Sequence, residues 1–205
     1  MKKFRLLTMV ALLCATMIVS ADAMAQDNKH EISLSYGWGR SSDWMGFGAS
    51  YVESIVGKNT DVYNNIGPIG LEYHCNVKPT VGVGAIAVFG YNKEKIKLPG
   101  NTPAALRKEA VYTIMPSIKF HWLQRDNWGM YSKMALGVSF YHVEGEYYDD
   151  NGNLDPSTKA TNTHSYINFQ ASVLGFEAGS DVVRGFAEAG VGEQGFLLAG
   201  LRFMF

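Results

Sequence analysis

The chain has 205 residues and a formal net charge of −1, from 18 basic and 19 acidic side chains. This near-neutral balance gives no reason to expect a nucleic-acid partner. Hydrophobic residues make up 47% of the chain, and its length suits one domain.

The first 25 residues have the pattern of a secretory signal peptide. A basic start, Met1–Arg5, precedes the apolar stretch Leu6–Val19, and Ala23-Met24-Ala25 forms a small-residue cleavage site. We therefore predict that residues 1–25 are removed and that residues 26–205 form the mature domain. A membrane anchor is the alternative, but the apolar stretch is short for a bilayer. Cleavage would leave Cys75 without a cysteine to pair with.

Apolar and polar residues alternate in eight segments of the mature chain. A period of two predicts strands with two different faces. The predicted strands are His30–Trp38, Pro68–Val77, Val81–Tyr91, Val111–Trp122, Trp128–Tyr141, Ser165–Glu177, Val183–Val191 and Leu197–Phe205.

The two faces of these strands differ in polarity, and the difference is the reverse of that in a soluble barrel. One face is apolar and nearly free of charge, and aromatic at its ends. The other carries Glu72, His74, Lys119, His121, Lys133, Arg184, Glu188 and Arg202. A soluble lipocalin-like barrel or sandwich would bury its apolar face and expose its polar one. The inverted pattern instead predicts an all-β fold, an eight-stranded antiparallel up-and-down transmembrane β-barrel.

The links between the predicted strands alternate in length. Those after the second, fourth and sixth strands are a few residues long. Those after the first and fifth, Gly39–Gly67 and Glu144–His164, are long, and Asn92–Glu109 after the third is intermediate. Outer-membrane barrels have short periplasmic turns and longer extracellular loops. This pattern predicts that both termini are periplasmic.

Two positions disturb the alternation. Pro116 lies inside the fourth predicted strand and removes one ladder hydrogen bond. The alternation also blurs over Leu174–Phe176 at the end of the sixth strand. We expect a β-bulge at each position.

The closing residues carry a resemblance to a known family. The runs Gly185–Gly192, Gln194–Phe196 and Gly200–Phe205 are similar to small eight-stranded bacterial outer-membrane barrels, the class of OmpX and the membrane domain of OmpA, and to barrels of Bacteroides-type bacteria. The resemblance implies an integral outer-membrane protein in contact with phospholipid and lipopolysaccharide. It also implies that barrel-insertion machinery reads the terminal strand, with Leu201, Phe203 and Phe205 as the signal.

The charged face is expected to fill the lumen. Eight strands leave an interior just wide enough for side chains, and buried charges are costly unless they are paired. We therefore expect the eight charged and histidine residues of the second face to form a polar network. A narrow pore is the less favoured reading, and no cofactor or metal site is predicted.

The family also includes lipid-modifying enzymes, so an acyl hydrolase or transferase is the alternative function. Ser139, His142, His164 and Ser165 lie near the predicted outer rim. Ser139 and His142 have opposite parity, however, and their side chains should point to opposite faces. The His-x-Ser pattern of outer-membrane deacylases does not occur in this sequence, and a non-enzymatic protein is favoured.

The long loops are the remaining candidates for function. The first is unusually apolar, and Trp44, Phe47 and Tyr51 are a candidate contact surface; a loop folded over the barrel mouth is the alternative. Residues 149–155 resemble the start of a calcium loop, but an Asn-Gly hairpin turn explains them better. The sequence thus predicts a monomeric, non-enzymatic outer-membrane barrel that acts in envelope integrity or in surface interaction with an unidentified ligand.

Overall fold

Eight antiparallel strands close into one barrel in the computed structural model, which describes residues 30–40, 59–97, 103–149 and 153–205. Each strand pairs with its neighbours in sequence, and the first pairs with the last. The predicted up-and-down eight-stranded barrel is therefore confirmed. The strands are β1 His30–Trp38, β2 Asn59–Lys78, β3 Val81–Lys97, β4 Pro103–Gln124, β5 Trp128–Tyr147, β6 Ala160–Gly179, β7 Val183–Gly192 and β8 Leu197–Met204.

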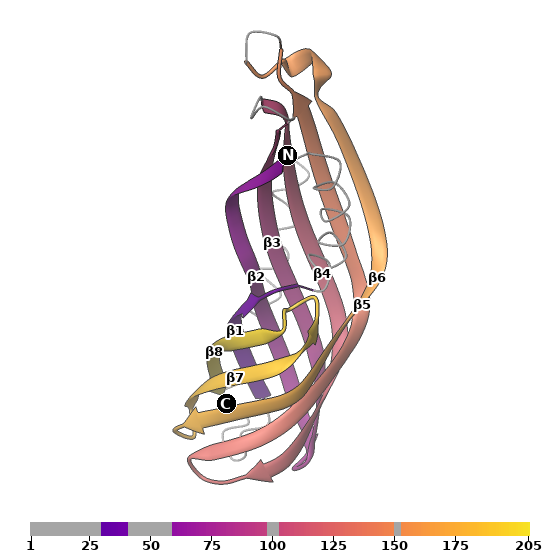
Figure 1. Cartoon of the computed structure of the whole chain (residues 1–205). Helices are drawn as coiled ribbons and strands as arrows, with labels where there is room; N and C mark the ends of the chain where they lie inside the picture. Colours follow the sequence, from indigo (N-terminus) through magenta and orange to yellow (C-terminus); the bar gives the residue numbers. More distant parts are fainter. Residues whose placement is uncertain (1–29, 41–58, 98–102, 150–152) are drawn as a thin grey trace.

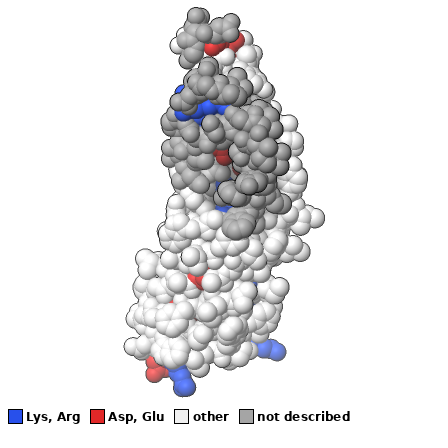
Figure 2. Space-filling view, in the orientation of Figure 1, with Lys and Arg blue, Asp and Glu red and all other residues white. Residues whose placement is uncertain are grey.

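The barrel is apolar outside and polar inside. On β1, Ser33 and Ser35 are buried while Leu34 is 55% exposed, and on β6 Ile167 is 81% exposed beside the buried Asn168. The lower half of the surface in Figure 2 is largely free of charged side chains until its lower end, where both signs reappear. This is the surface of a membrane-spanning barrel, because the exposed side chains of its middle would meet lipid.

The strands differ greatly in length. β1, β7 and β8 have 9, 10 and 8 residues, whereas β2, β4, β5 and β6 have 20, 22, 20 and 20, and β3 has 17. Figure 1 shows that β2–β6 continue far beyond the three short strands as one curved sheet. We call this part, beyond the level where β1 and β7 end, the extracellular sheet, after the side on which the long loops are predicted to lie.

The predicted loops were in part wrong. Residues 59–67, 92–97 and 103–109 are strand, so that only five residues separate β3 from β4, and β5 and β6 are likewise longer than predicted. Alternation identifies a strand where one face meets an apolar medium and the other a polar one. In residues 92–97 and 103–109 apolar and polar residues no longer alternate, and the signal is lost there.

The two expected bulges had different outcomes. The prediction at Pro116 was wrong: the β4–β5 pairing skips Met115 and Pro116 but resumes in the same register. The bulge near Leu174 is confirmed, because β6 gains one residue, Val173, against both of its neighbours. An inserted residue reverses the facing of every residue after it, so Glu177 points into the lumen.

No helix in the described residues is long and apolar enough to cross a membrane. The one short 3₁₀ turn described by the structure, η2 Pro156–Thr158, lies in the β5–β6 link and is capped by Asp155, which accepts a hydrogen bond from the Ser157 amide.

Candidate functional site: the barrel lumen and its mouth

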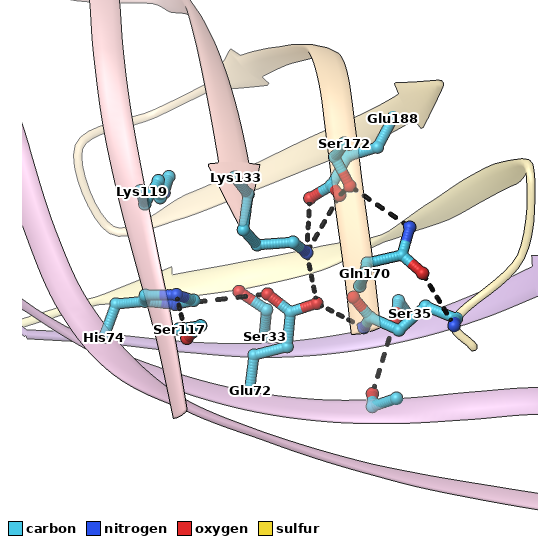
Figure 3. A network of polar contacts seen from close by, with 12 residues as sticks. Ser33, Ser35, Glu72, His74, Ser117, Lys119, Lys133, Gln170, Ser172 and Glu188 are labelled. Carbon is cyan, nitrogen blue, oxygen red and sulfur yellow. Dashed lines mark hydrogen bonds and ion pairs between the residues drawn. The ribbon is translucent and has the colours of Figure 1, made fainter. Parts of the chain in front are cut away.

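The middle of the lumen is built around one lysine. Lys133 Nζ on β5 lies 2.7 Å from Glu72 Oε1 on β2 and 2.8 Å from Glu188 Oε2 on β7. Ser172 donates to Glu188 over 2.5 Å, and Gln194 Nε2 donates to Glu72 over 2.6 Å. Figure 3 shows Lys133, Glu72 and Glu188 converging from different walls of the barrel. At this level, side chains of β2, β5, β6, β7 and the β7–β8 link are in contact across the lumen.

A second group of charges lies nearer the short turns. Lys119 Nζ is 2.5 Å from Glu31 Oε2, and Arg202 Nε is 3.3 Å from the same oxygen. Arg202 also pairs with Glu177, whose other oxygen accepts from Arg184 over 2.9 Å. Arg184 reaches the β4–β5 turn, where its guanidinium donates to a backbone carbonyl over 2.8 Å. This group joins five strands, β1, β4, β6, β7 and β8, and the β4–β5 turn at this end of the barrel.

Tyr131 joins the two groups. The Lys119 ammonium and the Arg202 guanidinium both lie over its ring, at 4.5 and 4.7 Å from the ring centre. Its hydroxyl donates to Glu188 over 2.7 Å and accepts from Arg202 over 3.0 Å. A buried aromatic ring can stabilise cations on its faces while its hydroxyl satisfies a carboxylate.

The two groups together are charge-balanced. Four carboxylates face four cations, all buried: Glu31, Glu72, Glu177 and Glu188 against Lys119, Lys133, Arg184 and Arg202. Pairing of this kind offsets much of the desolvation cost of each ion. No cluster of metal-ligating side chains occurs among the described residues.

The two lumenal histidines sit beside these groups. His74 Nε2 lies 3.0 Å from Ser117 Oγ, and its Nδ1 is 4.0 Å from Glu72. His121 Nε2 is 3.8 Å from Glu31, and neither of its ring nitrogens has a hydrogen-bond partner. His74 therefore contacts a serine hydroxyl, as a catalytic base would, but His74 and Ser117 are both buried among the lumenal side chains.

All eight residues of the predicted lumen network lie on the inner wall and are buried. Alternation did not identify three others that connect them. Glu31 lies next to the first residue of β1, Glu177 follows the bulge, and Tyr131 is an aromatic residue on the polar face. The parity of Ser33 and Ser35 would have placed Glu31 inside.

The mouth of the lumen is closed by hydroxyl and amide groups. Ser139 lies 2.6 Å from Thr113, and Asn168 donates to Ser139 over 3.1 Å and to Glu193 over 2.7 Å. Glu193 belongs to the β7–β8 link. At Gly195 in the same link, φ is +112° and a Cβ would lie 2.6 Å from the Trp38 carbonyl oxygen. The link can therefore pack over the mouth only with glycine at that position.

The candidate catalytic residues of the alternative, lipid-modifying function do not lie close to one another. His142 is on the outer face, 3.1 Å from Thr163 and 3.7 Å from Glu144, whereas Ser139 is fully buried inside. The His164 ring packs beside Tyr166, with ring centres 6.3 Å apart. A serine hydrolase needs the serine and histidine within hydrogen-bond reach, and this pair lies on opposite sides of the wall.

The other predicted sites are placed as follows. Leu201 and Phe203 face outward with 53% and 46% exposure, and Phe205 stacks on His30 with ring centres 5.8 Å apart. The loop residues Trp44, Phe47 and Tyr51 and the signal segment 1–25 lie outside the described residues.

Comparison with known proteins gives neither a matching family model nor a matching curated relative. Solved structures do match. Ail, the attachment invasion locus protein of Yersinia pestis, aligns with a TM-score of 0.47 and 12% identity over 88% of this chain and all of that one. Its complex with the heparin analogue sucrose octasulfate gives 0.42 and 12%, over 86% and 98%. OprG from Pseudomonas aeruginosa gives 0.33 and 11%, over 86% and 93%.

Proposed function

We propose that this chain is an integral outer-membrane protein with a closed lumen, and that its extracellular sheet serves surface interaction. The unequal strand lengths carry the proposal. A membrane-spanning strand needs about 9–11 residues, which β1, β7 and β8 nearly match. The surplus of about ten residues in β2–β6 corresponds to roughly 30 Å of strand, which serves no purpose in spanning the membrane.

The extracellular sheet has an open edge along β6. β7 pairs with β6 only from Gln170 onward, whereas β5 pairs with it from Ala160. Within the described chain, the β6 residues before Phe169 thus pair on one side. The Glu193 amide donates to the Phe169 carbonyl on the other side. Because ladder groups alternate along a strand, Thr161, Thr163, Ser165 and Ile167 direct their N–H and C=O groups to that open side.

An open strand edge is a template for an extended peptide. We propose such a segment of a surface partner as the ligand class. The filled lumen supports this assignment over a pore, and the separation of Ser139 from His142 supports it over a lipid hydrolase. Envelope integrity would use the same barrel without a ligand, and we rank it second.

The experiment uses the full chain, expressed in a Gram-negative host, purified and refolded in nanodiscs. The barrel is exposed to an array of extended peptides. Thr163→Pro removes one edge N–H without touching the β5 ladder, whereas Thr163→Ala keeps the N–H and loses the same hydroxyl. We expect binding that Thr163→Pro lowers at least tenfold and Thr163→Ala leaves unchanged. Equal effects of both variants, or the absence of any binding peptide, would overturn the edge assignment.

A separate measurement tests the membrane assignment. The unheated protein should migrate differently from boiled protein on a gel and should fractionate with outer membranes. Recovery from the soluble periplasm would contradict the proposal.

A further inference from the structure

Lysines gather on the outward face of the extracellular sheet. On β3, Ile86, Val88 and Gly90 face the lumen, so that Lys93, Lys95 and Lys97 share the outer face. On β4 the buried residues are odd-numbered, from Val111 to Lys119, and Lys108 is therefore outward as well. The register places Lys93 directly opposite Lys108.

Like charges directly opposite each other destabilise a β-sheet unless an anion lies between them. The lumen of this barrel shows how the chain handles such a pair. Lys119 and Lys133 are also directly opposite, and there Glu31, Glu72 and Glu188 lie within ion-pair distance of one or the other.

The pair Lys93 and Lys108 on the outward face lacks an equivalent set of carboxylates. Glu144 stands opposite Lys108 in the register, but its carboxylate lies 3.2 Å from Lys159, which is also 4.0 Å from Glu146. No carboxylate of the described side chains lies within ion-pair distance of Lys93. Asp61 on β2 is opposite Lys95. Lys108 therefore shares the charge of Glu144 with Lys159, and among the described side chains the carboxylates do not balance the opposed pair Lys93 and Lys108.

The position of Lys93 and Lys108 in the barrel wall indicates which anion could lie between them. Phe89 packs on Tyr112 with ring centres 5.2 Å apart, and Tyr112 is 53% exposed on the lipid-facing wall beside Phe140. Aromatic side chains of this kind mark the membrane interface. Lys93 is four residues beyond Phe89 on the same face, about 13 Å farther along the strand, where we expect the headgroup phosphates to lie. Basic side chains at this depth bind anionic headgroups.

We propose that Lys93 and Lys108 bind a phosphate group of a lipid in the outward-facing leaflet. The inference rests on the proposed membrane location and adds a lipid site to it. Phosphate between the two ammonium groups would remove their repulsion, as the carboxylates do for Lys119 and Lys133.

The test compares lipid retention. The full chain is refolded into phosphatidylcholine vesicles that contain either diphosphorylated lipid A or the same glycolipid without its phosphates, and bound lipid is counted by native mass spectrometry after detergent extraction. The variants are the double substitution Lys93→Gln/Lys108→Gln and, as a control for total charge, Lys78→Gln/Arg125→Gln at the exposed turns of the opposite end.

We expect phosphate-dependent retention that falls about tenfold or more in the first variant and stays unchanged in the control. Lys93→Arg/Lys108→Arg should retain the lipid. Equal retention of both glycolipids, or equal loss in both Gln variants, would overturn the proposal. The gel shift of the unheated protein distinguishes failure of this site from failure of the proposed membrane location. A chain that inserts but does not select the phosphorylated glycolipid contradicts this site alone. A chain that fails to insert contradicts the membrane location.

Discussion

Lys133 and Glu72 belong to β5 and β2, strands that are not neighbours in the barrel, yet their charged atoms are 2.7 Å apart. Side chains from separate walls therefore meet inside the lumen. Such a contact supports our proposal that an ion-pair network fills the barrel in place of a channel.

Loss of the Lys133 ammonium should destabilise the fold strongly. Lys133→Met leaves Glu72 and Glu188 buried without their shared cation, and breaking a buried pair costs about 3–5 kcal/mol. The free energy of unfolding is measured by urea titration of the protein in lipid vesicles. Lys78→Met, at an exposed turn residue, is the control. A loss no larger than that of the control would show that the network contributes little.

Removal of both partners should open the lumen. Glu72→Ala/Lys133→Ala deletes two large side chains that meet in the lumen, so we expect single-channel conductance in planar bilayers to rise severalfold above that of the unaltered protein. Glu144→Ala/Lys159→Ala removes an ion pair from the extracellular sheet and should leave the conductance unchanged. An unaltered barrel that already conducts as well as the lumen variant would refute the closed lumen.

Alternation was sufficient to place the barrel and eight of its lumenal residues, because lipid on one side and a polar interior on the other select opposite residue types at every second position. It was insufficient where that contrast ends. Asn92–Glu109 looked like a loop because apolar and polar residues do not alternate there, and Glu177 was not placed in the lumen because a single inserted residue, Val173, reverses the parity of the residues after it. The Lys133–Glu72 contact depends on barrel closure, which alternation does not encode.

The bulge at Val173 should be essential for insertion. Deletion of Val173 would turn Glu177 from the lumen toward lipid and separate it from Arg184 and Arg202, or else turn the preceding half of β6 over. We expect the deletion to abolish the fast-migrating band of unheated protein, whereas Val173→Ala, which keeps the chain length, should fold. A deletion variant that folds as well as Val173→Ala would show that β6 can shift its register freely.

The extracellular hairpin should respond to acid through Glu144. The hydrogen bond from Lys159, and then the charge of Lys159, lower the pKa of Glu144 below its usual value of 4.5. A carboxyl group with a lowered folded pKa stabilises the folded state above its usual pKa, and this contribution is lost as the pH falls through the lowered value. Lys159→Gln should return the pKa of Glu144 toward 4.5, which a carbon-13 carboxyl titration by NMR would detect. An unchanged titration would exclude the contact in solution.

The central claim is that the barrel spans the outer membrane with the long ends of β2–β6 outside. Two asparagines at opposite ends test it: Asn153 in the β5–β6 link and Asn127 in the β4–β5 turn, both exposed. Each is replaced by Cys in a chain whose Cys14 and Cys75 are Ser, and intact cells are treated with a membrane-impermeant maleimide. The account predicts labelling of Asn153→Cys in intact cells and of Asn127→Cys only after the outer membrane is broken. Labelling of both or of neither in intact cells, or the reverse pattern, would contradict it.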